Sequence, residues 1–240
     1  RLGIPFVQEV IAGSRAVEQF IPDVRVIVEL GGEDAKLTFF DNGADQRMNG
    51  ICAGGTGAFI DQMAILLKTD AKGLNTLAEK SSIIYPVAAR CGVFAKTDIQ
   101  ALLNEGARKE DIAASIFQAV VNQTISGLAA GRKIRGKVGF LGGPLYFLPE
   151  LRRRFKETLQ LDDNDMVVPE NAQVYVAIGA ALSAWVSGSD ILSVNQLRNL
   201  ICQNKRASKS SLKSLEPLFE SDEDYCEFVK RHSASTVKRG

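Results

Sequence analysis

The chain has 240 residues, of which 45% are hydrophobic and 24% are charged. This composition is typical of a globular protein large enough to bury one substantial core. The formal net charge of +1 gives no reason to expect nucleic acid or a membrane surface as a partner. No apolar run reaches the roughly 18 residues that span a bilayer, and the first residues do not resemble a signal peptide. We therefore expect a cytoplasmic protein with no nucleic-acid and no membrane partner.

The first fifty residues predict one helix and three strands. Apolar residues recur at helical spacing within residues 6–20, and Ile21-Pro22-Asp23 ends that helix. Residues 24–30 are β-branched and almost continuously apolar, which is typical of a strand buried on both faces. Two further strands are expected at residues 36–40 and 44–49, joined by a hairpin turn at residues 41–43. Three short strands in meander order therefore open the domain.

The middle of the chain is predicted to be helical, and strands then alternate with helices. Periodicity and glycine stops predict four helices, over residues 58–67, 74–80, 97–104 and 109–130. A buried strand at residues 137–141 is followed by a helix that runs to about residue 156. A strand at residues 166–168 and a helix over residues 172–187 come next. We expect residues 1–187 to form one α/β domain. Residues 188–240 are polar and are expected to form an appendage, with residues 205–213 as a linker.

Two glycine turns follow predicted buried strands, at Gly31-Gly32-Glu33-Asp34 and at Leu141-Gly142-Gly143-Pro144. Glycine lets the backbone approach a ligand closely and point its N–H groups at phosphate oxygens. Turns at the carboxyl ends of neighbouring strands converge on one crevice. Glu33 and Asp34 suit a Mg²⁺ ion beside phosphate, and Lys36 suits phosphate itself. A Gly-Gly pair after a strand, taken alone, is more often a plain tight turn than a ligand site.

Two of the four cysteines each precede a predicted helix within a glycine-containing segment. Cys52 begins the string that continues through Gly54, Gly55 and Thr56 to a helix, and Cys91 precedes the next helix but one. A helix N-terminus stabilises the thiolate, which is the form that binds soft metals. Two such ligands are half of a 4Fe–4S site, so a complete cluster requires two chains at a two-fold axis. Two unrelated buried cysteines are the alternative that spacing alone leaves open.

Four strings in this order resemble the BadF/BadG/BcrA/BcrD ATPase family, which includes the activators of 2-hydroxyacyl-CoA dehydratases and relatives of the benzoyl-CoA reductase ATPases. They are Glu29–Lys36 (ELGGEDAK), Met48–Gly57 (MNGICAGGTG), Cys91–Asp98 (CGVFAKTD) and Phe140–Gly143 (FLGG). The resemblance covers roughly residues 1–187, and the two cysteine strings together are specific to the family. The tail lies outside it.

The resemblance implies an actin-like ATPase fold of the ribonuclease H-like class, with this chain as the second subdomain. It implies that Gly31 and Gly32 form a phosphate loop with Asp34 and Lys36 beside it. Gly142 and Gly143 would form the adenosine loop. The implied cofactors are ATP or ADP with Mg²⁺ and a 4Fe–4S cluster on Cys52 and Cys91, shared across a homodimer. ATP hydrolysis would then drive an electron into a dehydratase partner.

The sequence also departs from the family pattern. The phosphate-binding hairpin of the first half is absent, and the chain enters at Arg1 as if in mid-fold, so we expect a fragment that is not a competent ATPase by itself. Glu29 stands where the family commonly has Asp. The Gly-Gly-Glu-Asp string is more similar to the long, duplicated members of the family than to the short dedicated activators. Two alternatives therefore stay open, a small-molecule kinase of the same fold and a non-catalytic nucleotide-binding module, neither of which needs a cluster.

Overall fold

The computed structural model describes residues 6–41, 43–50, 55–89, 91–186, 192–207 and 216–233. The chain divides into two compact units, Pro5–Ser189 and a smaller unit made of Asp190–Gly240 with Arg1–Ile4. The larger unit holds the α/β fold, and the smaller unit holds two helices. The sequence-based boundary between residues 187 and 188 stays a prediction, because it falls outside the described residues.

Within the described residues, one mixed sheet has the strand order β3-β2-β1-β4-β5. Its strands are β1 (Val26–Leu30), β2 (Ala35–Phe39), β3 (Asp45–Met48), β4 (Val138–Leu141) and β5 (Met166–Val167). β1, β2 and β3 pair antiparallel in sequence order, whereas β4 lies parallel to β1 and β5 parallel to β4. The predicted meander and the predicted alternation of strands and helices are both confirmed. Glu29 of β1 stands opposite Lys36 of β2 and Leu141 of β4.

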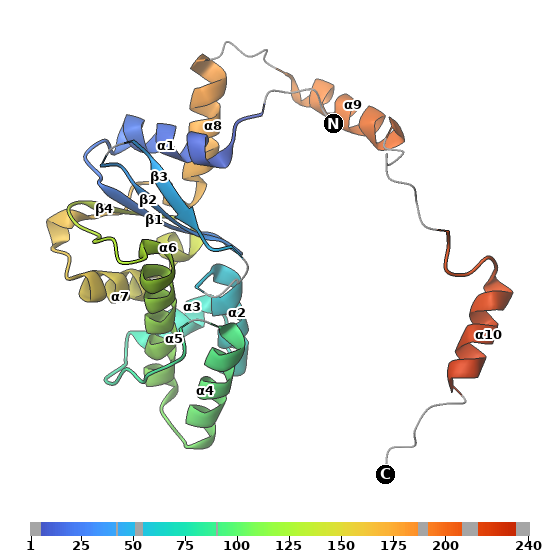
Figure 1. Cartoon of the computed structure of the whole chain (residues 1–240), viewed down its shortest axis with the longest axis horizontal. Helices are drawn as coiled ribbons and strands as arrows, with labels where there is room; N and C mark the ends of the chain where they lie inside the picture. The colour runs from blue at the N-terminus through green and yellow to red at the C-terminus, as the bar shows by residue number, and fades with distance from the viewer. Residues whose placement is uncertain are drawn as a thin grey trace. The chain divides into compact units, whose positions relative to one another are not determined.

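Helices cover both faces of this sheet (Figure 1). On one side lie α1 (Glu9–Phe20) and α8 (Tyr175–Val186). The other side carries α2 (Gly57–Leu66), α3 (Ala71–Ala78), α4 (Gly92–Asn104), α5 (Lys109–Thr124), the π-helix η1 (Ile125–Ala129), α6 (Gly143–Phe147) and α7 (Pro149–Leu159). The short 3₁₀ helices η2 (Asp163–Asp165) and η3 (Ala172–Val174) flank β5.

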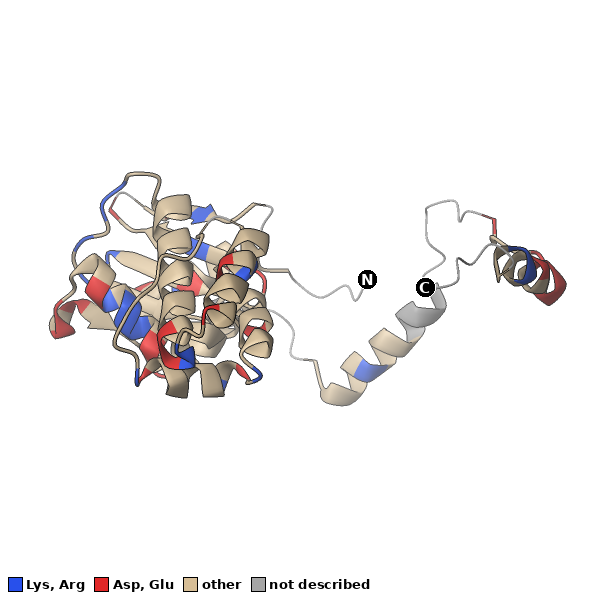
Figure 2. Cartoon of the chain, turned by 90° about the horizontal axis from the view of Figure 1, so that it is seen from below, with Lys and Arg blue, Asp and Glu red and all other residues tan. Residues whose placement is uncertain are grey.

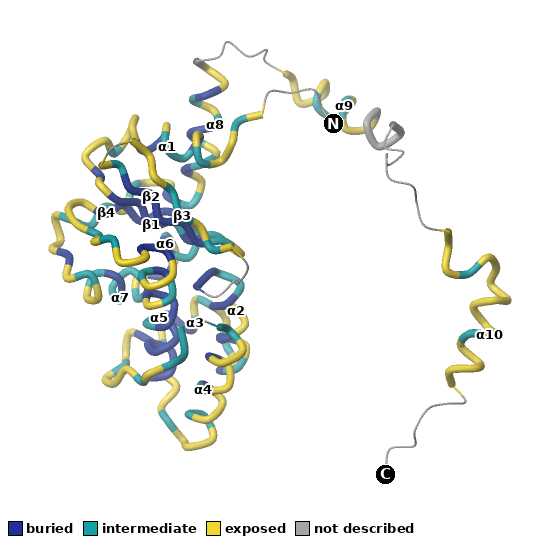
Figure 3. Tube along the Cα trace, viewed as in Figure 1, coloured by how far each residue is buried: buried dark blue, intermediate teal, exposed yellow. Residues whose placement is uncertain are grey.

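The central strand β1 is buried on both faces, as its continuous apolar character predicts (Figure 3). Val26, Val28 and Leu30 belong to the large core beneath α2, α5 and α7, whereas Ile27 belongs to a smaller core with α1 and Tyr175. The continuous helix Lys109–Ala129 is the one described helix long and apolar enough to cross a membrane. Its most apolar window is 67% buried, so it is the central helix of the large core.

Three helices differ from their predicted bounds for local reasons. α4 begins at Gly92, ahead of the predicted residue 97, because Cys91 takes the extended conformation of an N-cap. The single helix predicted to run to about residue 156 is two helices, and the break lies at Leu148 because Pro149 follows it. The predicted helix over 109–130 changes from α to π geometry at Ile125.

The smaller unit contains α9 (Val194–Ala207) and α10 (Asp222–Ser233). The predicted linker at residues 205–213 is wrong for its first three residues, which end α9, and the rest of it lies outside the described residues. α10 has acidic residues in its first turn and basic residues in its last turn, which complements the helix dipole (Figure 2). Phe219 packs its ring against Tyr225 and Phe228 of this helix.

An extended segment of residues 81–89 is held against α5 and α4 by side chains. The buried carboxylate of Asp111 accepts hydrogen bonds from the backbone N–H of Ser82 (2.7 Å) and of Ile83 (3.0 Å). Ser115 Oγ accepts the N–H of Tyr85 at 2.8 Å. Asp98 on α4 accepts the N–H of Ala88 at 2.8 Å. These contacts satisfy the backbone of a segment without regular structure, and they set the path of the chain toward Cys91.

We expect Asp111→Ala to lower the free energy of unfolding by about 1–3 kcal/mol at neutral pH, because buried amides lose their acceptor. Hydrogen bonds from Ser82 and Ile83 outweigh burial and hold the pKa of Asp111 below its ordinary value of 3.8. The stabilisation that the Asp111 carboxylate provides is therefore fully present above about pH 3.8, and it is lost as the pH falls through the lowered pKa of the folded state. Chemical denaturation at pH 7 and at falling pH measures both effects.

The matched control is Asp163→Ala, because the Asp163 side chain is 92% exposed. A surface pair of this kind contributes little, so the control should change stability by less than about 0.5 kcal/mol. Equal losses in the two variants, or a loss for Asp111→Ala that stays constant from pH 7 to pH 3, would contradict the prediction.

Candidate functional site

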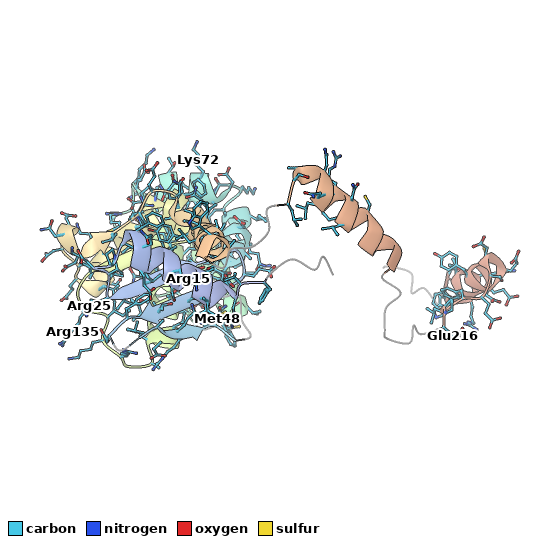
Figure 4. The ribbon with its side chains drawn as sticks, turned by 90° about the horizontal axis from the view of Figure 1, so that it is seen from above. Arg15, Arg25, Met48, Lys72, Arg135 and Glu216 are labelled. Atoms are coloured by element: carbon cyan, nitrogen blue, oxygen red, sulfur yellow. The ribbon has the colours of Figure 1, made fainter. Side chains whose placement is uncertain are left out.

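The two predicted glycine turns lie side by side because β1 and β4 are parallel neighbours and each turn follows the carboxyl end of its strand. Gly142 has φ +91°, and a Cβ at this position would lie 2.0 Å from the carbonyl oxygen of Leu30. Glycine at 142 is therefore required both by backbone conformation and by the approach to β1. Figure 4 shows Met48, at the end of β3, far from Arg25 and Arg135, which precede β1 and β4. The turns lie at the Met48 end of the sheet.

The N-terminus of α2 joins the two turns. The N–H of Gly57 donates to the carbonyl of Gly31 at 3.0 Å, and the N–H of Ala58 donates to Gly32 at 2.7 Å. A Cβ on Gly57 would lie 3.3 Å from both the Gly31 oxygen and Pro144 Cγ. Two amides that a helix start leaves unpaired are thereby satisfied, and they fix the position of the first turn.

These elements surround a pocket of about 500 Å³. A volume of this size suits a small organic ligand. Its lining is largely apolar, with the carboxylates of Glu33 and Asp61 as charged groups. The lining residues are Gly32, Glu33, Gly57, Ala58, Ile60, Asp61, Ala71, Gly143, Pro144, Phe147 and Leu148.

Four of the sequence-predicted residues meet in this pocket, namely Gly32, Glu33, Gly143 and Pro144. Gly31 and Gly142 lie behind it and shape the two turns. Gly55 and Thr56 precede α2, where Thr56 is its buried N-cap residue. Gly54 lies outside the described residues. The assignment of these residues to a nucleotide stays a prediction.

Sequence reasoning missed several lining residues. Gly57 was within the recognised glycine string, and its place at the helix start was the available signal. Asp61 and Phe147 had none, because each is an ordinary residue in a helix whose orientation depends on the tertiary structure. Phe147 is 67% exposed although it is large and apolar, which is the mark of a ring left available beside a pocket.

Asp34 and Lys36 do not line this pocket. The Lys36 side chain is 3% exposed, and its Nζ lies 2.5 Å from Glu9 Oε1, 2.6 Å from Asp34 Oδ2 and 3.2 Å from Glu29 Oε1. We call these four residues the Lys36 cluster. A contact between Lys36 and phosphate stays a prediction, and the arrangement favours a supporting role instead.

One ammonium group is shared by three carboxylates in the Lys36 cluster. Burial lowers the pKa of Lys36, but hydrogen bonds to Asp34 and Glu9 and the charge of Glu29 outweigh it, so the net pKa is raised. Burial also raises the pKa of Glu29, and Lys36 offsets this only in part. Lys36 therefore stays charged, whereas burial keeps the pKa of Glu29 above its ordinary value although Lys36 lies beside it.

Cys91 is half-buried at the N-cap of α4. Val93 and Phe94, which follow Gly92, have side chains that are 71% and 66% exposed. Cys52 lies outside the described residues, so the fit of a cluster rests on Cys91 alone. No group of three metal-ligating side chains occurs among the residues that were described.

Comparison with known proteins identifies relatives. A sequence model of the BadF/BadG/BcrA/BcrD ATPase family matches residues 5–184. The 2-hydroxyisocaproyl-CoA dehydratase activator of Clostridioides difficile is 30% identical over 197 residues, which are 81% of this chain and 71% of the relative. The (R)-2-hydroxyglutaryl-CoA dehydratase activating ATPase of Acidaminococcus fermentans is 33% identical over 68% of this chain and 62% of its own length.

Two solved structures of dehydratase activators are similar to this chain. Component A of the Acidaminococcus fermentans (R)-2-hydroxyglutaryl-CoA dehydratase has a TM-score of 0.69 at 31% identity, over 75% of this chain and 69% of that chain. The activator of the 2-hydroxyisocaproyl-CoA dehydratase from Clostridium difficile, with bound ADPNP, has a TM-score of 0.67 at 27% identity, over 88% and 72%. The fold is the actin-like ATPase fold, and the chain belongs to the BadF/BadG/BcrA/BcrD ATPase family.

Proposed function

We propose that this chain is the adenine-nucleotide-binding half of an ATP-dependent activator of a 2-hydroxyacyl-CoA dehydratase-type enzyme in the cytoplasm. The observation that carries the proposal is the pocket that both glycine turns and the start of α2 enclose. Its support from relatives is that three similar proteins are named as activators of such dehydratases, and one similar structure holds ADPNP.

In this proposal the Gly31-Gly32 turn binds the phosphates, and the Gly142-Gly143 turn lies against the adenosine. Gly32 and Gly143 have no neighbouring atom within 4 Å of a built Cβ, so their open sides face the pocket rather than the protein interior. Backbone N–H groups of such turns suit phosphate oxygens. Glu33 would orient the hydration shell of Mg²⁺, and Phe147 would stack on the adenine ring.

The second part of the proposal concerns electron transfer. Cys52 and Cys91 would supply two thiolates to a 4Fe–4S cluster, and the same two residues of a second chain would supply the others. Such a cluster, when bound, supplies a single low-potential electron. Cys91 at the start of α4 supports this site, and exposed Val93 and Phe94 beside it suit a contact with a second copy. The acceptor would be the dehydratase.

Substitution at the two open glycines tests the nucleotide site. We expect Gly32→Val and Gly143→Val to raise the Kd for ADP about tenfold or more while the protein stays folded, since each new side chain enters the pocket rather than the core. Isothermal titration calorimetry of the complete protein measures the Kd. Gly127→Ala is the control, because it adds a methyl group in ordinary contact on η1, away from the pocket. An unchanged Kd in both pocket variants would place the nucleotide elsewhere.

Replacement of Phe147 separates the base from the phosphates. We expect Phe147→Ala to weaken ADP binding about 5- to 100-fold, because base stacking on an aromatic ring contributes about 1–3 kcal/mol. Binding of inorganic pyrophosphate should be unaffected. Trp185→Ala is the control, since Trp185 is 86% exposed on α8. A parallel loss of ADP and pyrophosphate binding would assign Phe147 to the shape of the pocket instead.

Iron content tests the cluster. Anaerobic reconstitution of the complete protein should yield about four irons per two chains, and a Cys52→Ser/Cys91→Ser variant should lose them together with the absorbance of the cluster. A Cys202→Ser/Cys226→Ser variant is the control, because these thiols are exposed on α9 and α10. Iron uptake that does not depend on Cys52 and Cys91 would contradict the cluster and favour a nucleotide-binding module. Phosphate transfer to a small alcohol would favour a kinase.

A further inference from the structure

The two neighbouring acids of the first glycine turn have different surroundings. Glu33 lines the pocket. Asp34 instead folds back over Gly31, where its Oδ1 lies 1.9 Å from the position that a Cβ on Gly31 would take. Its Oδ2 pairs with Lys36 at 2.6 Å, and its carbonyl accepts the N–H of Gly31 at 2.8 Å, which closes the turn. Asp34 is therefore committed to the turn and to Lys36, and Glu33 is the carboxylate left to the pocket.

Lys36 joins this turn to helix α1. It stands opposite Glu29 across the β1–β2 pair, and its third partner, Glu9, lies in the first turn of α1. Because the Lys36 side chain is almost fully buried, water cannot replace a lost partner at low cost. The four residues thus connect three elements through one ammonium group.

Helix α1 is seated on a second element that depends on close packing. It runs against α8, where a Cβ on Gly179 would lie only 1.7 Å from the carbonyl oxygen of Ala12. Its buried residues Ala16 and Val17 pack with Ile27 and Tyr175. These apolar contacts hold the middle and the end of α1, whereas Glu9 at its start is half-exposed and held through Lys36. The start of α1 is the part that the ion pairs can release.

We propose that Lys36 is a positioning residue that couples the Gly31–Asp34 turn to the start of α1. The proposal rests on nucleotide binding at the pocket described above. A ligand that draws the turn toward itself displaces Asp34 relative to Lys36, and the ammonium then redistributes between Glu9 and Glu29. The hold on α1 changes as a result, which makes α1 a reporter of the nucleotide state.

Hydrogen exchange of the complete protein, followed by mass spectrometry, tests this link. In the wild type, ADP with Mg²⁺ should change the exchange of residues 9–20. In Lys36→Met we expect the amides at the start of this segment to exchange about tenfold faster without ligand and to lose their response to ADP. Glu9→Gln should abolish the response too, and as a half-exposed site it is a variant that folds readily. Lys36→Arg should restore part of it.

The control is Lys137→Met, since Lys137 pairs with Asp23 in an exposed position. It should leave the exchange of residues 9–20 unchanged. The Kd for ADP in Lys36→Met should stay within about threefold of the wild type, which a direct phosphate ligand would not allow.

Two results would overturn the inference. One is an α1 that exchanges and responds in Lys36→Met as it does in the wild type. The other is a Kd for ADP that rises tenfold or more in Lys36→Met but not in Glu9→Gln, which would make Lys36 a phosphate ligand. A wild type that does not bind ADP overturns the proposed function, and the ligand-free exchange of residues 9–20 then decides the Lys36–α1 link by itself.

Discussion

The parallel pairing of β1 with β4 is the constraint on which the rest of the structure depends. Two strands that run in the same direction place their carboxyl ends together, so the turns after Leu30 and Leu141 must meet. The crossover between these strands contains α2 to α5, and its first helix returns to cap the first turn through Gly57 and Ala58. The pocket is thus a consequence of topology, with glycine at the points where backbones approach each other.

Sequence patterns predicted those parts of the fold that depend on local chemistry. The continuous apolar run 24–30 predicted a strand buried on both faces, and the glycines after the two buried strands predicted the edge where a site forms. Helix bounds were less accurate, at the N-cap Cys91 and at the break that precedes Pro149. The extended path of residues 81–89 depends on partners distant in sequence, such as Asp111, and no periodicity predicts it. The pattern also did not predict the π geometry of residues 125–129.

In the candidate site, too, the residues fixed by local backbone requirements were predictable, and those placed by tertiary packing were not. Gly32 and Gly143 were predictable because a backbone requirement selects glycine regardless of the rest of the fold. The position of Phe147 beside the pocket depends on how α6 packs near α2, which no local pattern shows. The sequence places Lys36 directly after the turn, but its side chain contacts Glu9 of α1 and does not line the pocket, because alternate residues of a strand face opposite sides.

The composition of the Lys36 cluster argues that stability alone does not explain it. Three carboxylates around one buried ammonium leave an excess of negative charge, and burial raises the pKa of Glu29. Apolar residues of similar size are often at least as stabilising in such a place as a buried ion pair. A lysine with three carboxylate partners, however, can exchange one partner for another, whereas an apolar contact has a single arrangement. An arrangement of this kind is suited to a connection between the turn and α1 that must change during a cycle.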